Sequence, residues 1–203
     1  MRIFVLLVTL LVMAGCAAPS IDANVTAFHT PELQAAGGKT IVIRPSPPTR
    51  ETSLEFLNYR PKIAEKLRHV GFTVVEDIAN PDYIAEVSYG VDGTETYSAT
   101  TSSPTFGLGY YGSPFYYGGT FNRRYDTRTW VEYNRFIALE IIEGKYAGVD
   151  APPRIYEGRA QSTGHCPTVA GVFDEILDAL FRDFPGANGK TTFVTIPWDG
   201  SCE

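Results

Sequence analysis

Residues 83–92, YIAEVSYGVD, alternate apolar and polar side chains, and this alternation decides the fold class. A period of two places the apolar side chains on one face of a strand and the polar ones on the other. Residues 128–143 carry a matching pattern, and residues 155–163 carry a shorter one. We therefore expect three strands of one sheet, with one face of that sheet buried.

The segment before this run predicts a strand, a helix and a second strand. Residues 40–44 and residues 72–76 are short apolar runs typical of buried strands. Between them, apolar side chains recur at helical spacing. The helix is expected to begin at about Leu54 or Asn58 and to end at Val70. A strand, helix and strand in this order predict a right-handed crossover.

Pro61 is expected in the first turn of this helix, where its missing N–H costs no hydrogen bond. The Asn80-Pro81 turn is expected to reverse the chain, so that the next strand runs antiparallel to the first. Residues 168–183 contain the clearest helical stripe, and residues 192–196 predict a last strand. The sequence thus predicts an α+β fold, a mostly antiparallel sheet with two helices packed on it and a long Gly/Tyr-rich insertion between two strands.

Length and composition exclude several classes of protein. The 203 residues suffice for one ordinary domain, and three cysteines are too few for a small disulfide scaffold. With 23 acidic and 17 basic side chains the net charge is −6, which argues against a nucleic-acid partner. No apolar run of the sequence reaches the roughly 20 residues of a membrane-spanning helix.

The first fifteen residues are typical of an export signal. Arg2 provides the positive charge, and an apolar stretch follows as far as Met13. Ala14 and Gly15 then precede Cys16, and this order resembles the lipobox of bacterial lipoproteins. In such lipoproteins the signal is cut before the cysteine, whose thiol receives a diacylglycerol and whose amino group is acylated. We predict lipidation at Cys16; the alternative is an ordinary signal peptide with an incidental cysteine.

Lipidation divides the chain into a signal peptide (1–15), a lipidated tether (16–24) and a single periplasmic domain (25–203). Two or more acyl chains anchor a protein stably without spanning the bilayer. Ala17 stands where an aspartate would resemble a signal for retention in the inner membrane. We therefore expect a protein anchored in the outer membrane and facing the periplasm.

Residues 96–127 are expected to form a flexible aromatic and glycine-rich insertion. Residues 96–122 contain no charged side chain, and a loop of this length is usually functional or disordered. Three interpretations stay open: a solvated loop without a ligand; a surface for a protein partner, a second copy or lipid headgroups; and a stacking platform for a glycan. The candidate contact residues are Phe106, Tyr110, Tyr111, Phe115, Tyr116, Tyr117, Phe121, Arg123 and Arg124.

The expected strand directions place this insertion on the membrane-proximal side of the domain. The antiparallel strand before it would end where the first strand began, close to the tether. Aromatic rings suit a bilayer interface, and Arg123, Arg124 and Arg128 could meet anionic headgroups. We therefore predict that residues 106–121 touch the membrane surface or a membrane-bound partner.

One motif imitates a phosphate-binding loop. Gly37-Gly38-Lys39-Thr40 matches the end of that pattern, but Leu33 stands where the pattern requires glycine. The motif also precedes a strand, so no helix N-terminus is available to hold phosphate. We interpret it as a turn.

Other arrangements do not predict an active site or a metal site. The three histidines have no metal-binding spacing. Cys166 follows His165, but neighbouring side chains diverge, which argues against a nucleophile and its base. Asp82, Glu86 and Asp92 share one strand face, as paired carboxylates would, although a solvated sheet face is the simpler interpretation. We expect no catalytic residue, no metal and no cofactor.

Cys166 and Cys202 predict a disulfide, because they are the cysteines left in an oxidising compartment once Cys16 is lipidated. The helix over residues 168–183 is about 24 Å long, and a strand over residues 191–197 is about 23 Å long. The strand therefore returns the chain to the level at which the helix starts. Two free thiols are the alternative.

Several landmarks of this chain occur in a recognisable order: residues 39–43 (KTIVI), residues 53–56 (SLEF), the Gly/Tyr-rich insertion, residues 155–160 (IYEGRA) and residues 184–186 (FPG). In this order they resemble the bacterial lipoprotein family catalogued as domain of unknown function 4136. The resemblance covers roughly residues 25–197 and implies a small α/β envelope domain behind a lipid anchor. It implies no catalytic residue.

We predict a non-enzymatic outer-membrane lipoprotein, an accessory or binding module of the cell envelope. Its expected partners are the membrane, through the lipid anchor, and an envelope protein. The alternative is a binder or hydrolase of envelope glycans or lipids that uses the aromatic insertion as its platform. Glu86→Gln or Asp92→Asn distinguishes the two, because either change abolishes a hydrolase and leaves a scaffold intact.

Overall fold

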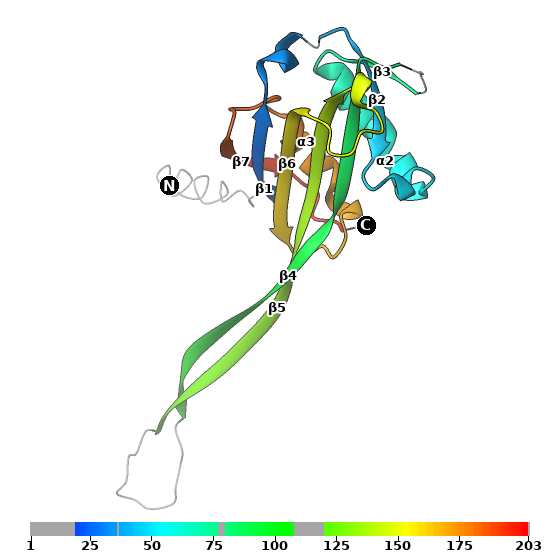
Figure 1. The fold of residues 1–203 in the computed structure, drawn as a ribbon. Helices are drawn as coiled ribbons and strands as arrows, with labels where there is room; N and C mark the ends of the chain where they lie inside the picture. Colours follow the sequence, from blue (N-terminus) through cyan, green and yellow to red (C-terminus); the bar gives the residue numbers. More distant parts are fainter. Residues whose placement is uncertain (1–18, 36, 77–79, 108–119, 203) are drawn as a thin grey trace, which may run out of the picture.

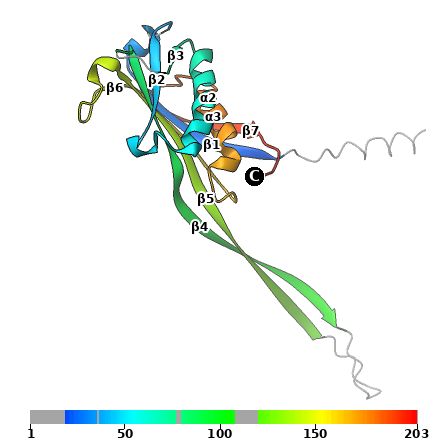
Figure 2. The ribbon, with the colours of Figure 1, turned by 90° about the vertical axis from the view of Figure 1, so that its right-hand side faces the viewer.

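The computed structural model describes residues 19–35, 37–76, 80–107 and 120–202, which form one seven-stranded sheet with two α-helices on one face (Figures 1 and 2). The strand order is β3-β2-β4-β5-β6-β1-β7. The strands are β1 (Ser20–His29), β2 (Thr40–Pro45), β3 (Thr73–Val75), β4 (Tyr83–Gly107), β5 (Thr120–Glu143), β6 (Arg154–Gly164) and β7 (Lys190–Pro197). The α-helices are α2 (Leu54–His69) and α3 (Phe173–Phe181), and short 3-10 helices cover Pro31–Ala35, Pro48–Arg50, Gly144–Tyr146 and Ala170–Val172. The predicted α+β class, with a mostly antiparallel sheet and two helices, is confirmed.

β2, α2 and β3 form the predicted strand–helix–strand unit, and β3 pairs parallel to β2. Pro61, however, lies inside α2 and not in its first turn, because the helix begins at Leu54, the earlier of the two predicted starts. A proline there removes the hydrogen bond to the carbonyl of Leu57. Leu57 is 47% exposed, so water can reach this side of the helix. Gly71, with φ of 102°, turns the chain out of the helix toward β3.

The direction predicted for β4 is wrong, because β4 pairs parallel to β2. β3 and β4 lie on opposite sides of β2, so the connection between them crosses β2 and does not close a hairpin. The Asn80-Pro81 segment therefore does not reverse the chain. β5 and β6 are antiparallel to their neighbours, in agreement with the predicted mostly antiparallel sheet.

Residues 20–24 are strand, not tether, because β1 begins at Ser20. β1 lies between β6 and β7 and pairs antiparallel with both. Ile21 and Ala23 are buried, and the exposed residues between them give β1 its alternation. Since β1 runs antiparallel to β4, its first residue lies toward the end of the sheet where β4 and β5 leave the body.

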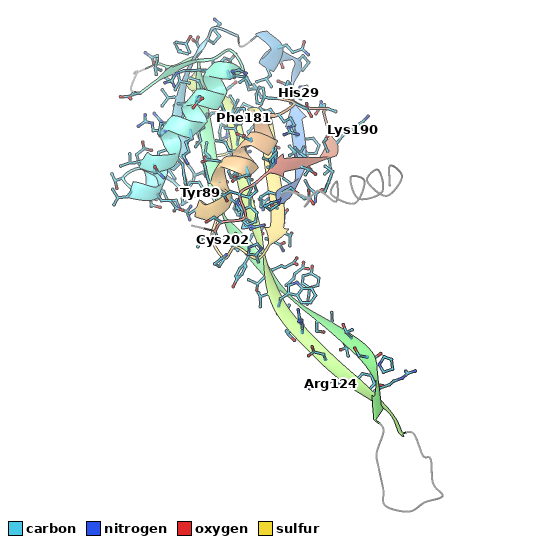
Figure 3. The ribbon with its side chains drawn as sticks, turned by 180° about the vertical axis from the view of Figure 1, so that it is seen from behind. His29, Tyr89, Arg124, Phe181, Lys190 and Cys202 are labelled. Carbon is cyan, nitrogen blue, oxygen red and sulfur yellow. A yellow bond between two sulfur atoms is a disulfide. The ribbon has the colours of Figure 1, made fainter. Side chains whose placement is uncertain are left out.

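The core lies between the sheet and the two helices. α2 and α3 lie side by side on one face of the sheet in Figure 2, and Figure 3 shows them in front of it. α3 is shorter than the predicted helix over residues 168–183, because a 3-10 turn occupies Ala170–Val172. Its buried side chains are Phe173, Ile176, Leu177, Ala179, Leu180 and Phe181.

Candidate functional site: a projecting β-ribbon

β4 and β5 continue past the body of the sheet as a two-stranded projection (Figures 1 and 2). β2 pairs with β4 only as far as Val87, and β6 pairs with β5 only from Tyr133 onward. Among the described strands, residues 95–107 and 120–132 therefore pair only with each other. We call these two segments the ribbon. At about 3.3 Å per residue the ribbon is roughly 40 Å long.

Much of the predicted flexible insertion is thus regular strand. Residues 96–107 and 120–127 belong to the ribbon, and their pairing is continuous as far as Gly107 and Thr120. Residues 108–119 of the insertion lie outside the described residues. The apolar/polar pattern does not mark these strands because the body covers neither face of the ribbon. Threonine, which favours strands, recurs along both segments instead.

The structure places four of the predicted contact residues on the ribbon. The backbones of Phe106 and Phe121 pair with each other close to its far end. Arg123 and Arg124 follow on β5, where both are exposed, and neighbouring residues of a strand point to opposite faces. Figure 3 shows Arg124 far from the body of the protein. The other predicted contacts lie outside the described residues: Tyr110, Tyr111, Phe115, Tyr116 and Tyr117.

An aromatic pair that the sequence analysis missed lies closer to the body. The rings of Tyr97 and Trp130 stack across the ribbon with centroids 5.9 Å apart. The indole N–H of Trp130 donates to Glu132 at 3.0 Å, and the Tyr97 hydroxyl donates to Glu95. The bond to Glu95 raises the pKa of Tyr97. Both rings are more than a third exposed, so the pair is held in place but accessible.

The charges of the ribbon beyond this pair lie on β5 alone. Arg123, Arg124, Asp126 and Arg128 are all exposed. They face residues 99–104 of β4, none of which is charged. Within the described part of the chain, none of the four forms an ion pair. These charges are therefore available to a second molecule.

A buried arginine marks the point where the ribbon joins the body. Arg135 is 1% exposed, and its Nη2 donates to Ser162 Oγ at 3.3 Å, which joins β5 to β6. Burial lowers the pKa of Arg135. Gly164 leaves room for the guanidinium, since a Cβ at that position would lie 2.8 Å from Nη2. Arg135 therefore has a structural role, because it links β5 to β6 at the base of the ribbon.

The predicted disulfide between Cys166 and Cys202 is confirmed, with Cα atoms 5.4 Å apart. The bond fastens the C-terminal segment to the loop that precedes α3, and Figure 3 shows Cys202 near the base of the ribbon. His165 lies beside the two sulfur atoms. Because the sulfurs are bonded to each other, this cluster cannot offer thiolates to a metal ion.

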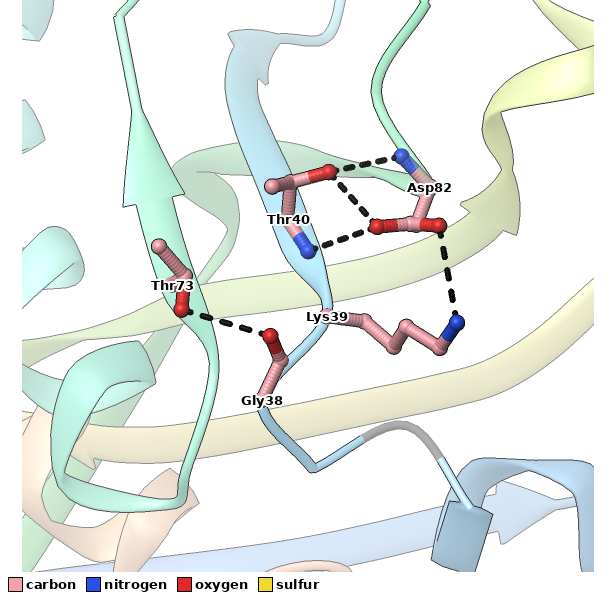
Figure 4. Close-up of polar contacts among 5 residues, drawn as sticks. All are labelled: Gly38, Lys39, Thr40, Thr73 and Asp82. Atoms are coloured by element: carbon pink, nitrogen blue, oxygen red, sulfur yellow. Dashed lines mark hydrogen bonds and ion pairs between the residues drawn. The ribbon is translucent and has the colours of Figure 1, made fainter.

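The three candidate carboxylates do not converge. Asp82 accepts hydrogen bonds from the backbone N–H of Thr40 at 2.9 Å and from its hydroxyl at 2.7 Å (Figure 4). These bonds lower the pKa of Asp82. Asp92 pairs with Arg159, and Glu86 lies between β2 and β5 on the sheet. Asp82 and Asp92 thus hold neighbouring segments together, and the trio forms no acid–base pair.

The sequence that imitates a phosphate-binding loop is a turn that leads into β2. Lys39 Nζ lies 3.9 Å from Asp82 Oδ1, and the carbonyl of Gly38 accepts a hydrogen bond from the Thr73 hydroxyl at 3.4 Å (Figure 4). The lysine is paired with a carboxylate, and a strand follows in place of a helix. The motif therefore joins β2 to its two parallel neighbours.

Comparison with protein-family models gives no match, and comparison with curated proteins gives no relative. The predicted lipidation residue, Cys16, lies outside the described residues. In the described ranges, no helix has the length and apolarity needed to cross a membrane.

Proposed function

We propose that this protein is a lipoprotein anchored in the outer membrane through Cys16 and facing the periplasm, where it acts as a non-enzymatic binding module. The ribbon carries the proposal, because it extends roughly 40 Å from the body without contributing to the core. A two-stranded ribbon alone is marginally stable in water, so its length calls for a role outside the fold. The lipobox-like order before Cys16 and the resemblance to the family of domain of unknown function 4136 support the location.

The partner we propose is an envelope protein. Both edges of the ribbon carry backbone N–H and C=O groups without a neighbouring strand among the described residues. Such groups match an added strand of another polypeptide, which is a recurring mode of peptide recognition. The stacked pair of Tyr97 and Trp130 and the exposed Arg123 and Arg124 supply side chains for specificity.

Site-specific photo-crosslinking in the cell tests this proposal. A photoreactive residue at Arg124 is expected to give discrete adducts with one or a few envelope proteins. The matched control places the same residue at Val149, which is 51% exposed at the opposite end of the body. Equal adducts from both positions, or none from Arg124, would overturn the proposal.

A ribbonless variant gives a second test. Gly93 and Asn134 are paired, so a two-residue Asn-Gly turn can join them and delete everything between. We expect this variant to fold and to lose function in the cell, because the described residues that it deletes pair with each other, and only Tyr133 among them also pairs with a further strand, opposite Gly164 of β6. Full function of the ribbonless variant would show that the ribbon is not needed for function and would contradict the proposal.

A further inference from the structure

We propose that the free edge of β5 binds the same edge of a second copy of this chain, in an antiparallel pairing centred on Thr127. This inference rests on the proposed function, in which the ribbon is the binding element. It adds the identity of the partner at the β5 edge, which is a second copy of this chain. Two ribbons would then form one four-stranded sheet, with the two bodies at opposite ends.

β5 is the better of the two ribbon edges for pairing. β4 carries Pro104, which has no N–H and is typical of a strand edge protected against pairing. Residues 120–132 of β5 contain neither proline nor glycine. The edge remains free as far as Tyr133, where β6 begins to pair. A pairing centred on Thr127 uses residues 122–132 and so ends where this free edge ends.

The side chains along β5 are complementary to themselves in this register. A two-fold axis perpendicular to the ribbon makes residues equidistant from the centre face each other on the same side of the sheet. Asp126 then faces Arg128 of the second copy, and Arg128 faces its Asp126. Arg124 faces Trp130 of the second copy, and each such pair brings a guanidinium onto an indole ring. Thr127 faces itself, and threonine pairs also favour strand pairing.

Other symmetric registers are less favourable. A centre at Asp126 places that carboxylate against its own copy and Arg124 against Arg128. A centre at Arg128 opposes two guanidinium groups, and like charges directly opposite each other destabilise a sheet. A centre at Tyr125 keeps a pair between Arg124 and Asp126, but leaves Arg128 and Trp130 without a charged or aromatic partner. The proposed centre gives each of these four charged and aromatic side chains a partner.

The pairing does not compete with contacts inside one chain. Asp126 and Arg128 face Thr101 and Ala99 of β4, and neither forms an ion pair within the described chain. Changes at these two positions are therefore expected to leave the ribbon folded. The edge-to-edge contact would also add on the order of ten backbone hydrogen bonds.

Cysteine crosslinking of the full-length chain tests the register. Directly opposite residues of an antiparallel pair have Cβ atoms about 4.5–5.5 Å apart, close to the reach of a disulfide. Under mild oxidation, Thr127→Cys is expected to give a disulfide-linked dimer. Thr100→Cys is the matched control, because Thr100 pairs with Thr127 at the same level of the ribbon but lies on the β4 edge. The unchanged chain controls for its native cysteines, and a dimer from Tyr125→Cys alone would overturn the proposed centre.

Charge reversal tests the contacts, with sedimentation of the purified full-length chain as the measurement. In the dimer, Asp126→Arg or Arg128→Asp alone places like charges opposite each other at two positions. Either change should raise the dissociation constant of the dimer roughly ten-fold. The double variant with both changes should regain the original affinity, because the two charges simply exchange places. In a dimer centred on Tyr125, the double variant would not recover.

The outcomes separate this inference from the proposed function. If the unchanged chain stays monomeric at all concentrations, and the photoreactive residue at Arg124 still captures another envelope protein, the self-pairing is wrong and the proposed function stands. If neither a dimer nor an adduct forms, both are wrong. A dimer that both single charge variants leave unchanged would show that the chain associates through another surface, which also overturns the inference.

Discussion

The ring of Tyr59 in α2 stacks on the ring of Phe173 in α3, with centroids 3.6 Å apart and planes within 4° of parallel. Tyr89 of β4 approaches both rings edge-on, with its centroid 5.0 Å from that of Tyr59 and 6.1 Å from that of Phe173. Three rings from three elements therefore join both helices to the strand that continues into the ribbon.

We expect Phe173→Ala to lower the free energy of unfolding by about 3–5 kcal/mol, because it removes a fully buried ring from this contact. Urea denaturation measures the change. Phe193→Ala is the matched control: this phenylalanine is 64% exposed, and its loss should change stability by less than about 0.5 kcal/mol. A similar loss of unfolding free energy in both variants would mean that the three-ring contact does not contribute to stability.

Removing the disulfide is expected to lower stability substantially. Cys166 and Cys202 are 36 residues apart in sequence. Closing a loop of that size contributes about 4 kcal/mol in the chain-entropy model. Cys202→Ser should therefore unfold at lower urea concentration than the parent chain. Alkylation of the unfolded, unreduced parent should label neither cysteine, and labelling of both would contradict the disulfide.

Gly171→Ala is expected to disturb the same region without touching a cysteine. A Cβ at Gly171 would lie 2.5 Å from the carbonyl carbon and oxygen of Cys202, so the C-terminal segment would have to move. We expect a lower unfolding midpoint and slower formation of the disulfide on refolding. Gly37→Ala is the control, since nothing lies within 4 Å of its Cβ position. Equal behaviour of the two variants would argue against the close approach.

The contact between Asp82 and Thr40 predicts a pH dependence. Hydrogen bonds from Thr40 hold the pKa of Asp82 below its ordinary value of 3.8. A lowered carboxyl pKa contributes stability above the ordinary value, and this contribution is lost as pH falls through the folded-state pKa. The melting temperature of Asp82→Asn should therefore be below that of the parent near neutral pH, and the gap should close below pH 3.8.

The control for this pH dependence is Asp150→Asn, which removes a carboxylate from an exposed turn. The melting temperature of this variant should stay close to that of the parent. A gap for Asp82→Asn that does not change with pH would show that the hydrogen bonds do not depend on the charge of the carboxyl.

Cys16→Ser tests the anchor. The variant should incorporate no labelled fatty acid and should no longer fractionate with membranes, because a single thioether carries the diacylglycerol in the lipoproteins that the first residues resemble. Unchanged incorporation, or unchanged fractionation with membranes, would contradict lipidation at this position. Cys202→Ser is a useful comparison, since it also removes a sulfur atom but leaves the lipobox-like order intact.

The sequence predicts strands and helices well where one face is buried. The alternation of residues 83–92 and the stripe of α3 both report such a face, and both elements form. β1 was missed because its first residues, 20–24, lie shortly after the signal and contain polar residues that suit a tether equally well. The ribbon was missed because neither of its faces is buried, so no apolar period marks it. One signal in the sequence could have indicated this strand: charged and aromatic side chains occupy every second position at Arg124, Asp126, Arg128 and Trp130.

Strand direction could not be derived from local pattern. The antiparallel β4 that the Asn80-Pro81 turn predicted would have placed the insertion beside the start of β2. β4 in fact runs parallel to β2, which places the ribbon at the other end of the sheet. β1 carries the chain from that same end toward the start of β2, so the first residue of β1 still lies toward the ribbon. The wrong direction of β4 and the missed strand β1 thus offset each other in where the start of the domain lies relative to the ribbon, and both features depend on long-range pairing.

The unbroken length of β4 and β5 also has a mechanical consequence. Each strand runs without interruption from the far end of the ribbon into the middle of the sheet, and is hydrogen-bonded there to a further strand, β2 or β6. A pull along the ribbon would load those inner ladders in shear, with many hydrogen bonds sharing the force, and would not unzip them one at a time. Such a force would therefore be distributed over the pairing of β4 with β2 and the pairing of β5 with β6 before it reached the helices.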